Sequence, residues 1–150
     1  MDKIVIQTED FDLTTEVSHT RSNNSQIGAI VSFIGTVRDL HPDSITSMTL
    51  EHYPEMTEKS LKSIVIDARE RWDLQNVTII HRVGKLKVND QIVLVVTTSE
   101  HRQAAFESCH FIIDYLKTDA PFWKKESTEQ KEGWVESRES DYTQKKRWQS

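Results

Sequence analysis

The sequence predicts an α+β domain in which two long helices cover a mainly antiparallel sheet. Two segments, residues 54–72 and 99–117, repeat apolar residues at helical spacing, and short β-branched segments lie around them. These strands and helices do not follow the regular alternation that builds a parallel sheet. With 150 residues, the chain has the length of one domain, residues 1–150, that can bury a core of its own.

The first third of the chain predicts three strands and a short helix. Residues 3–8 alternate apolar and polar side chains as a strand does, and Asp10 fits the N-cap of the helix that follows. Residues 28–37 are β-branched and apolar on both faces, which predicts a central strand, and Gly35 within it indicates a bulge or a close backbone approach. Residues 48–53 are predicted to pair with that strand as a hairpin with a long polar tip.

The first long helix is predicted to begin at Pro54 and to run to about Trp72, with an apolar stripe on one side and charges on the other. Residues 77–83 and 91–98 predict the next two strands. Within the first of them, His81 alternates with apolar residues. This pattern is typical of a packed or paired core histidine.

The second long helix is predicted to begin after Ser99, which is a good N-cap residue. It must end by Asp119, because a proline two residues later pushes the residue before it out of the helical conformation. Residues 122–127 and 134–137 then predict a C-terminal hairpin around Gly133.

Composition and charge narrow the class of protein. The net charge is −5 and 29% of the residues are charged, so we expect no general attraction to nucleic acid or to an acidic membrane. No apolar run is long enough to span a membrane, and no secretory signal is seen at the N-terminus. The single Cys109 excludes an internal disulfide and a multi-cysteine metal cluster, and we expect a cytoplasmic protein with no metal site. The polar tail, residues 138–150, is expected at a subunit interface.

The first candidate site is a short stretch in which Lys117 and Lys124 flank Pro121, Phe122 and Trp123. Aromatic rings between cations form an apolar floor with positive walls, which suits a flat anionic molecule. The turn at the proline can bring both lysines to one pocket, where each ammonium group disfavours the charge of the other. A lysine in that setting can be a proton donor, a base or a nucleophile. The alternative interpretation is a helix end followed by an edge strand with solvated lysines.

The second candidate site is cationic as well. His101 and Arg102 lie in the first turn of the second long helix, where each positive charge is unfavourable by roughly 0.3–1 kcal/mol. A bound anion would remove this conflict. Alternatively, Glu100 compensates and both side chains extend into water. Arg38 directly follows a buried strand and precedes a polar loop, which favours a functional role, although surface arginines are common. Cys109 lies on the apolar stripe of the helix and is expected to be inert.

Several stretches, taken together, resemble a single known family. They are residues 33–39, 50–53, 80–84, 99–102 with 104–106, 116–118 with 120–126, and 134–136 with 138–140. On these stretches the chain resembles the MoaE family, the large catalytic subunits of molybdopterin synthase. The resemblance extends from about residue 3 to 148.

The resemblance implies an α/β hammerhead fold and a homodimer within a heterotetramer. It implies that each chain binds a small ubiquitin-like sulfur-carrier subunit of the MoaD type, whose C-terminal Gly-Gly carries a thiocarboxylate. Two sulfurs would pass to cyclic pyranopterin monophosphate and form the dithiolene of molybdopterin, with no cofactor held by the enzyme itself.

The resemblance also implies roles for residues. By position, Lys117 and Lys124 match essential lysines of the family; our hypothesis is that Lys117 is the main catalytic group and that Lys124 positions the tail and the developing negative charge. Whether Lys117 acts covalently or by acid–base chemistry stays open. The remaining matched residues are the anion-binding Arg38, His101 and Arg102, Arg138 contributed across the dimer, and the pocket-lining Phe33, Pro121, Phe122 and Trp123.

Two other classes of protein would use the same residues. A non-catalytic module that binds an anion or a phosphorylated metabolite needs only charge, so it would tolerate Lys117→Arg, which a tuned lysine would not. A scaffold that only docks a ubiquitin-like tail would bind its partner without forming a product.

Overall fold

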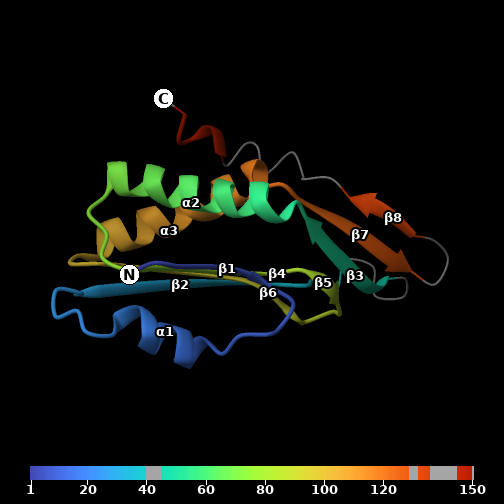
Figure 1. Ribbon diagram of the computed structural model, residues 1–150, viewed down its shortest axis with the longest axis horizontal. Helices are drawn as coiled ribbons and strands as arrows, with labels where there is room; N and C mark the ends of the chain where they lie inside the picture. The colour runs from blue at the N-terminus through green and yellow to red at the C-terminus, as the bar shows by residue number, and fades with distance from the viewer. Residues whose placement is uncertain (40–44, 129–131, 136–144, 150) are drawn as a thin grey trace.

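The computed structural model describes residues 1–39, 45–128, 132–135 and 145–149, and their main elements form two four-stranded sheets and three helices (Figure 1). In chain order the elements are β1 (Lys3–Gln7), α1 (Leu13–Arg21), β2 (Ala29–Thr36), β3 (Ile45–His52), α2 (Pro54–Arg71), β4 (Val77–Arg82), β5 (Gly84–Leu86), β6 (Gln91–Ser99), α3 (Arg102–Asp119), β7 (Phe122–Thr128) and β8 (Glu132–Val135). The predicted α+β class is confirmed.

The first sheet has the strand order β1-β4-β6-β2, in which β1 and β4 are parallel and the other pairs antiparallel. As predicted, α2 and α3 both cover one face of it, and α1 lies on the other face (Figure 1). The prediction that β2 is central was wrong, because β2 pairs with β6 and is the last strand in this order. Its apolar character reflects the packing of α3 against it rather than a strand on each side.

The second sheet has the order β5-β3-β7-β8 and is antiparallel throughout. The predicted hairpin between β2 and β3 was therefore wrong: the two strands lie in different sheets. Met48 and Leu50 of β3 instead pack with Val37 and Leu86 in a small core of their own. The C-terminal hairpin was predicted correctly, although Gly133 lies within β8 opposite Glu126.

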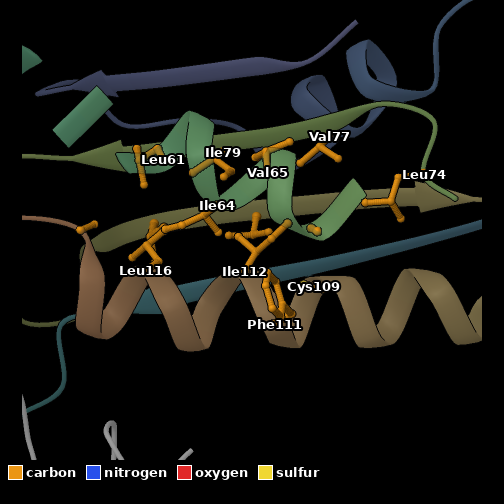
Figure 2. Packing of buried hydrophobic residues seen from close by; sticks show 14 residues of the cluster. Leu61, Ile64, Val65, Leu74, Val77, Ile79, Cys109, Phe111, Ile112 and Leu116 are labelled. Atoms are coloured by element: carbon orange, nitrogen blue, oxygen red, sulfur yellow. The ribbon is translucent and has the colours of Figure 1, made fainter. Parts of the chain in front are cut away.

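The main core lies between the first sheet and the helix pair α2 and α3 (Figure 2). Each element contributes fully buried side chains, which include Leu61 and Val65 of α2, Val77 and Ile79 of β4, and Ile112 of α3. Burying a side chain of this size is worth roughly 1.5–3 kcal/mol. This contact fixes α3 on the sheet and thereby places its C-terminal end.

The helix ends differ in part from the expected ones. Asp12, not Asp10, is the N-cap residue of α1, and its carboxylate accepts a hydrogen bond from the Thr15 amide at 3.0 Å. Ser99 does not cap α3, because its hydroxyl donates to the Asp73 carbonyl at 2.8 Å and the residue at the N-cap is His101. The helix α3 ends at Asp119, which is two residues beyond the expected end at about Lys117 and within the limit set by Pro121. Among the described residues, no helix is long and apolar enough to cross a membrane.

Candidate functional site

The turn between α3 and β7 places the two lysines. Lys117 lies in the last turn of α3, and β7 begins at Phe122. The Phe122 amide donates to the Ala120 carbonyl at 2.8 Å, and the hydroxyl of Thr57, which is fully buried on α2, donates to the Pro121 carbonyl at 3.1 Å. Pro121 therefore ends the helix and leads the chain into the strand that carries Lys124.

The alternation of side chains along β7 divides the aromatic residues between two faces. Phe122 and Lys124 are two residues apart and share one face, whereas Trp123 points to the other. The Phe122 ring stacks on the His81 ring, with centroids 3.7 Å apart and planes 14° from parallel. The Trp123 ring lies 4.7 Å from the Tyr53 ring. The structure thus brings Phe122 to the side of the lysine and places Trp123 on the opposite side of the strand.

A buried histidine is affected by the charges of both lysines. His81 is 5% exposed, and its pKa is lowered from 6.5 to about 4, chiefly by burial and also by electrostatic interaction with Lys117, Lys124 and His52. The hydrogen bond between the His81 ring and the Arg82 carbonyl raises this pKa, but it does not outweigh burial and the nearby charges. Since both ammonium groups act on the same imidazole, the turn does bring the two lysines into one cluster.

Arg38 lies two residues after the end of β2. It is exposed and directly follows Val37, whose buried side chain packs in the small core with Leu50. Leu50 is the residue of β3 that pairs with Lys124. Arg38 therefore follows a residue whose side chain packs with Leu50, the pairing partner of Lys124.

The second cationic pair lies far from the lysines within one chain. His101 and Arg102 are exposed at the start of α3, and Lys117 is near its end. At 1.5 Å per residue, Arg102 and Lys117 are separated by about 22 Å along the helix axis. The first turn contains no acidic residue, so the conflict of these cations with the helix dipole is present in the structure.

Phe33 lines a different part of the surface. A hollow of about 500 Å³ lies between β2, α3 and the C-terminal residues 147–148, and its lining includes Phe33, Phe106 and Ile113. Ile113 precedes Lys117 by four residues, so the two side chains lie on the same face of the helix, one turn apart. Neither Lys117 nor Lys124 lines the hollow. Arg138 lies outside the described residues.

The surroundings of His81 were not predicted. Its alternation with Val77 and Ile79 predicts a core position, and its burial is confirmed. What was missing is the contact with β7, because stacking on Phe122 joins residues 41 positions apart in different sheets. The signal that could have found it was the likeness of residues 80–84 to the family, to which no role was attached.

Comparison with known proteins identifies the family of this chain. A family model described as MoaE protein matches residues 6–119. The molybdopterin synthase catalytic subunit of Ralstonia nicotianae is 54% identical over 149 residues, covering 99% of this chain and 85% of that protein. The molybdopterin biosynthesis MoaE protein from Burkholderia ambifaria has a TM-score of 0.87 at 52% identity, covering 100% of this chain and 99% of that chain.

A more distant solved structure has the same fold. The protein–protein complex of subunits 1 and 2 of molybdopterin-converting factor from Helicobacter pylori contains a chain with a TM-score of 0.73 at 20% identity, covering 91% of both chains. Family model, close relatives and fold all agree over most of the chain. The chain therefore belongs to the MoaE family, the catalytic subunits of molybdopterin synthase.

Proposed function

We propose that this chain transfers sulfur from the C-terminal thiocarboxylate of a small ubiquitin-like subunit to cyclic pyranopterin monophosphate and so forms the dithiolene of molybdopterin. The observation that carries the proposal is that Lys117 at the end of α3 and Lys124 on β7 both act electrostatically on the buried His81 imidazole of β4. Two ammonium groups at one point suit a reaction in which an anionic sulfur donor meets an anionic acceptor.

The two lysines have distinct tasks in this proposal. The thiocarboxylate sulfur bonds to a carbon of the pterin precursor while a carbon–oxygen bond at that carbon breaks, and the oxygen leaves as water or on the phosphate group. Water then cleaves the bond between that sulfur and the acyl carbon. Sulfur stays on the pterin, and the tail of the small subunit leaves as a carboxylate. Lys117 stabilises the oxyanion that forms on the acyl carbon, and Lys124 holds the negative end of the tail.

The single thiol of this chain is not suited to carry the sulfur. Cys109 is its only cysteine, and it is 3% exposed within the main core. Burial raises the pKa of its thiol from 9.0 to about 12, which leaves almost no thiolate at neutral pH. Sulfur therefore has to be delivered by a partner, which supports the carrier subunit. The complex of two subunits from Helicobacter pylori supports the same assembly.

We further propose that the active form is a homodimer in which a second copy completes the site. Within one chain, Arg102 and Lys117 are about 22 Å apart on one rigid helix, so no single chain can close both on one ligand. His110 lies halfway between them and lines the hollow, and the nearby Phe106 ring is 63% exposed. Two α3 helices crossing antiparallel at this midpoint would place His101 and Arg102 of one copy beside Lys117 of the other. Arg138 is proposed to reach across the same interface.

Mixed dimers test the shared site. Lys117→Ala and Arg102→Ala chains carrying different tags are co-expressed, and dimers that contain one of each are purified. If the site is shared, one of the two sites is intact, and the mixed dimer forms product at about half the wild-type rate although each parent is impaired. If the site lies within one chain, the mixed dimer is no faster than its parents, and the dimer proposal is wrong.

Replacement of Lys117 by arginine separates catalysis from simple anion binding. Arginine keeps the charge but cannot release a proton or form an imine, and its planar group does not reproduce the ammonium geometry. We expect Lys117→Arg to bind the precursor with near wild-type affinity and to form little dithiolene. Normal product formation by this variant would contradict the assigned role of Lys117.

A further inference from the structure

The buried histidine beside the lysine pair has no task in the mechanism above. His81 lies on β4, paired with Ile6 of β1 on one side and with Val93 of β6 on the other. Its side chain is on the face of the sheet that α2 and α3 cover, with Val77 and Ile79. An apolar residue would fill this position at lower cost, since burying a polar ring is unfavourable unless its nitrogen atoms are satisfied.

The hydrogen bond of this ring defines its protonation. Nδ1 of His81 lies 2.8 Å from the Arg82 carbonyl oxygen. A carbonyl oxygen can only accept, so Nδ1 carries the hydrogen. In a buried neutral ring the other nitrogen, Nε2, then holds a lone pair and can only accept a hydrogen bond.

The orientation of the ring is also fixed. The Phe122 ring covers one of its faces at 3.7 Å, and the His52 ring lies 6.2 Å from Phe122 on the neighbouring strand. The charged groups that act on His81 are Lys117 from α3, Lys124 from β7 and His52 from β3. A single acceptor is therefore held in a fixed orientation where the charges of two ammonium groups act on it.

We propose that His81 is a positioning residue whose Nε2 accepts a hydrogen bond from the ammonium group of Lys117 or Lys124 and aims that group at the thiocarboxylate. A carboxylate in the same place would also orient a lysine, but it would neutralise the positive charge that the anionic ligands need. A neutral imidazole orients the ammonium group and leaves its charge available. The inference rests on the proposed sulfur transfer, for which it names a further residue.

Two substitutions separate this role from packing. His81→Phe keeps a ring that can stack on Phe122 but has no acceptor, whereas His81→Gln loses the stacked ring and keeps an oxygen that can accept. We expect kcat for dithiolene formation to fall about tenfold or more in His81→Phe, with the Kd of the small subunit unchanged, and to fall less in His81→Gln. If His81→Phe is at least as active as His81→Gln, packing is the role of the ring and the proposal is overturned.

Nuclear magnetic resonance of the ¹⁵N-labelled protein tests the hydrogen bond without substrate. This test does not depend on how the His81 variants fold. At pH 7 we expect His81 to carry its hydrogen on Nδ1. We also expect the Nε2 resonance to move in Lys117→Met or in Lys124→Met, which remove the donor at similar length. A hydrogen on Nε2, or an Nε2 resonance that neither substitution moves, overturns the proposal. If these signals are as expected but the wild-type protein forms no dithiolene, the sulfur-transfer function has failed while the hydrogen bond stands.

Discussion

The His81 ring on β4 stacks on the Phe122 ring on β7, and this contact joins the two sheets two residues before Lys124 on β7. The contact helps to keep water away from the imidazole, and burial is the main reason that the pKa of His81 is near 4. The same strand continues from Phe122 to Lys124, so the position of one catalytic group depends on this stack.

Removal of the Phe122 ring should raise the pKa of His81 toward its ordinary value. In Phe122→Ala, water reaches the ring, and we expect the pKa of His81 to rise from about 4 toward 6.5. A ¹H–¹⁵N titration of the histidine side chains measures this value. Trp123→Ala is the matched control, because Trp123 lies on the opposite face of β7 and should leave His81 unchanged. A pKa that stays near 4 in Phe122→Ala would show that the stack does not keep water out.

Stability should fall as acid is added, partly through His81. The unfolded chain binds a proton at this histidine near pH 6.5, whereas the folded chain does so only near pH 4, so protons favour unfolding between these values. The loss amounts to roughly 3 kcal/mol across the window, at 1.36 kcal/mol for each pKa unit. Urea unfolding of wild type and His81→Phe at pH 7 and pH 4.5 measures it. The variant should lose less stability than wild type, and an equal loss would exclude His81 as the cause.

Removing the ammonium group of Lys117 should abolish most catalysis without unfolding the protein. We expect Lys117→Ala to lower the single-turnover rate by about 10²–10³-fold, the usual cost of removing one group that stabilises an oxyanion. The melting temperature should change little, because Lys117 is exposed. Lys62→Ala on the exposed side of α2 is the control for loss of one positive charge. A rate within a few-fold of the control would remove Lys117 from the mechanism.

The only cysteine should be dispensable for sulfur transfer. Cys109→Ala leaves a small gap in the main core, for which we expect a destabilisation of about 1–2 kcal/mol. Dithiolene formation should continue at the wild-type rate at a temperature where the variant is folded. Loss of product in a folded Cys109→Ala protein would mean that sulfur passes through this thiol.

Gly28 should tolerate no side chain. A Cβ atom at this position would lie 2.2 Å from the Glu100 carbonyl oxygen, and the Gly28 amide donates to the Ser99 carbonyl at 2.9 Å. Gly28→Ala must therefore displace the backbone just before α3, at a cost of about 1–3 kcal/mol. We expect a lower melting temperature and weaker precursor binding at the neighbouring His101 and Arg102. Unchanged stability would mean that this approach is looser than the structure describes.

The parts of the fold that depend on local patterns could be predicted from the sequence, and the pairing of distant strands could not. The apolar stripes of α2 and α3 and the stop before Pro121 are local, and all were predicted correctly. The partner of β2 was not, because apolar β-branched residues suit an edge strand under a helix as well as a central strand. Pairing is decided by the packing of residues far apart, such as Met48 against Leu86.

In the candidate site, too, the features set by local sequence could be predicted, and those set by contacts between distant segments could not. Lys117, Pro121 and Lys124 are close in the chain, so their convergence could be predicted from one helix end and one turn. His101 and Arg102 stood out by their charge at a helix start, but their distance from Lys117 follows from the length of α3 as a rigid element. The stack of His81 on Phe122 joins two sheets and has no local signature.

The balance of sulfur during a single turnover tests the central claim most directly. The protein is mixed with the pterin precursor and a thiocarboxylated small subunit, and both the dithiolene product and the carboxylate form of the small subunit are measured by mass spectrometry. A small subunit that ends in an ordinary carboxylate is the control. The account predicts that two thiocarboxylates become carboxylates for each dithiolene formed, and that the control gives none. Hydrolysis of the thiocarboxylate without sulfur on the pterin, or a dithiolene formed with the control subunit, would contradict it.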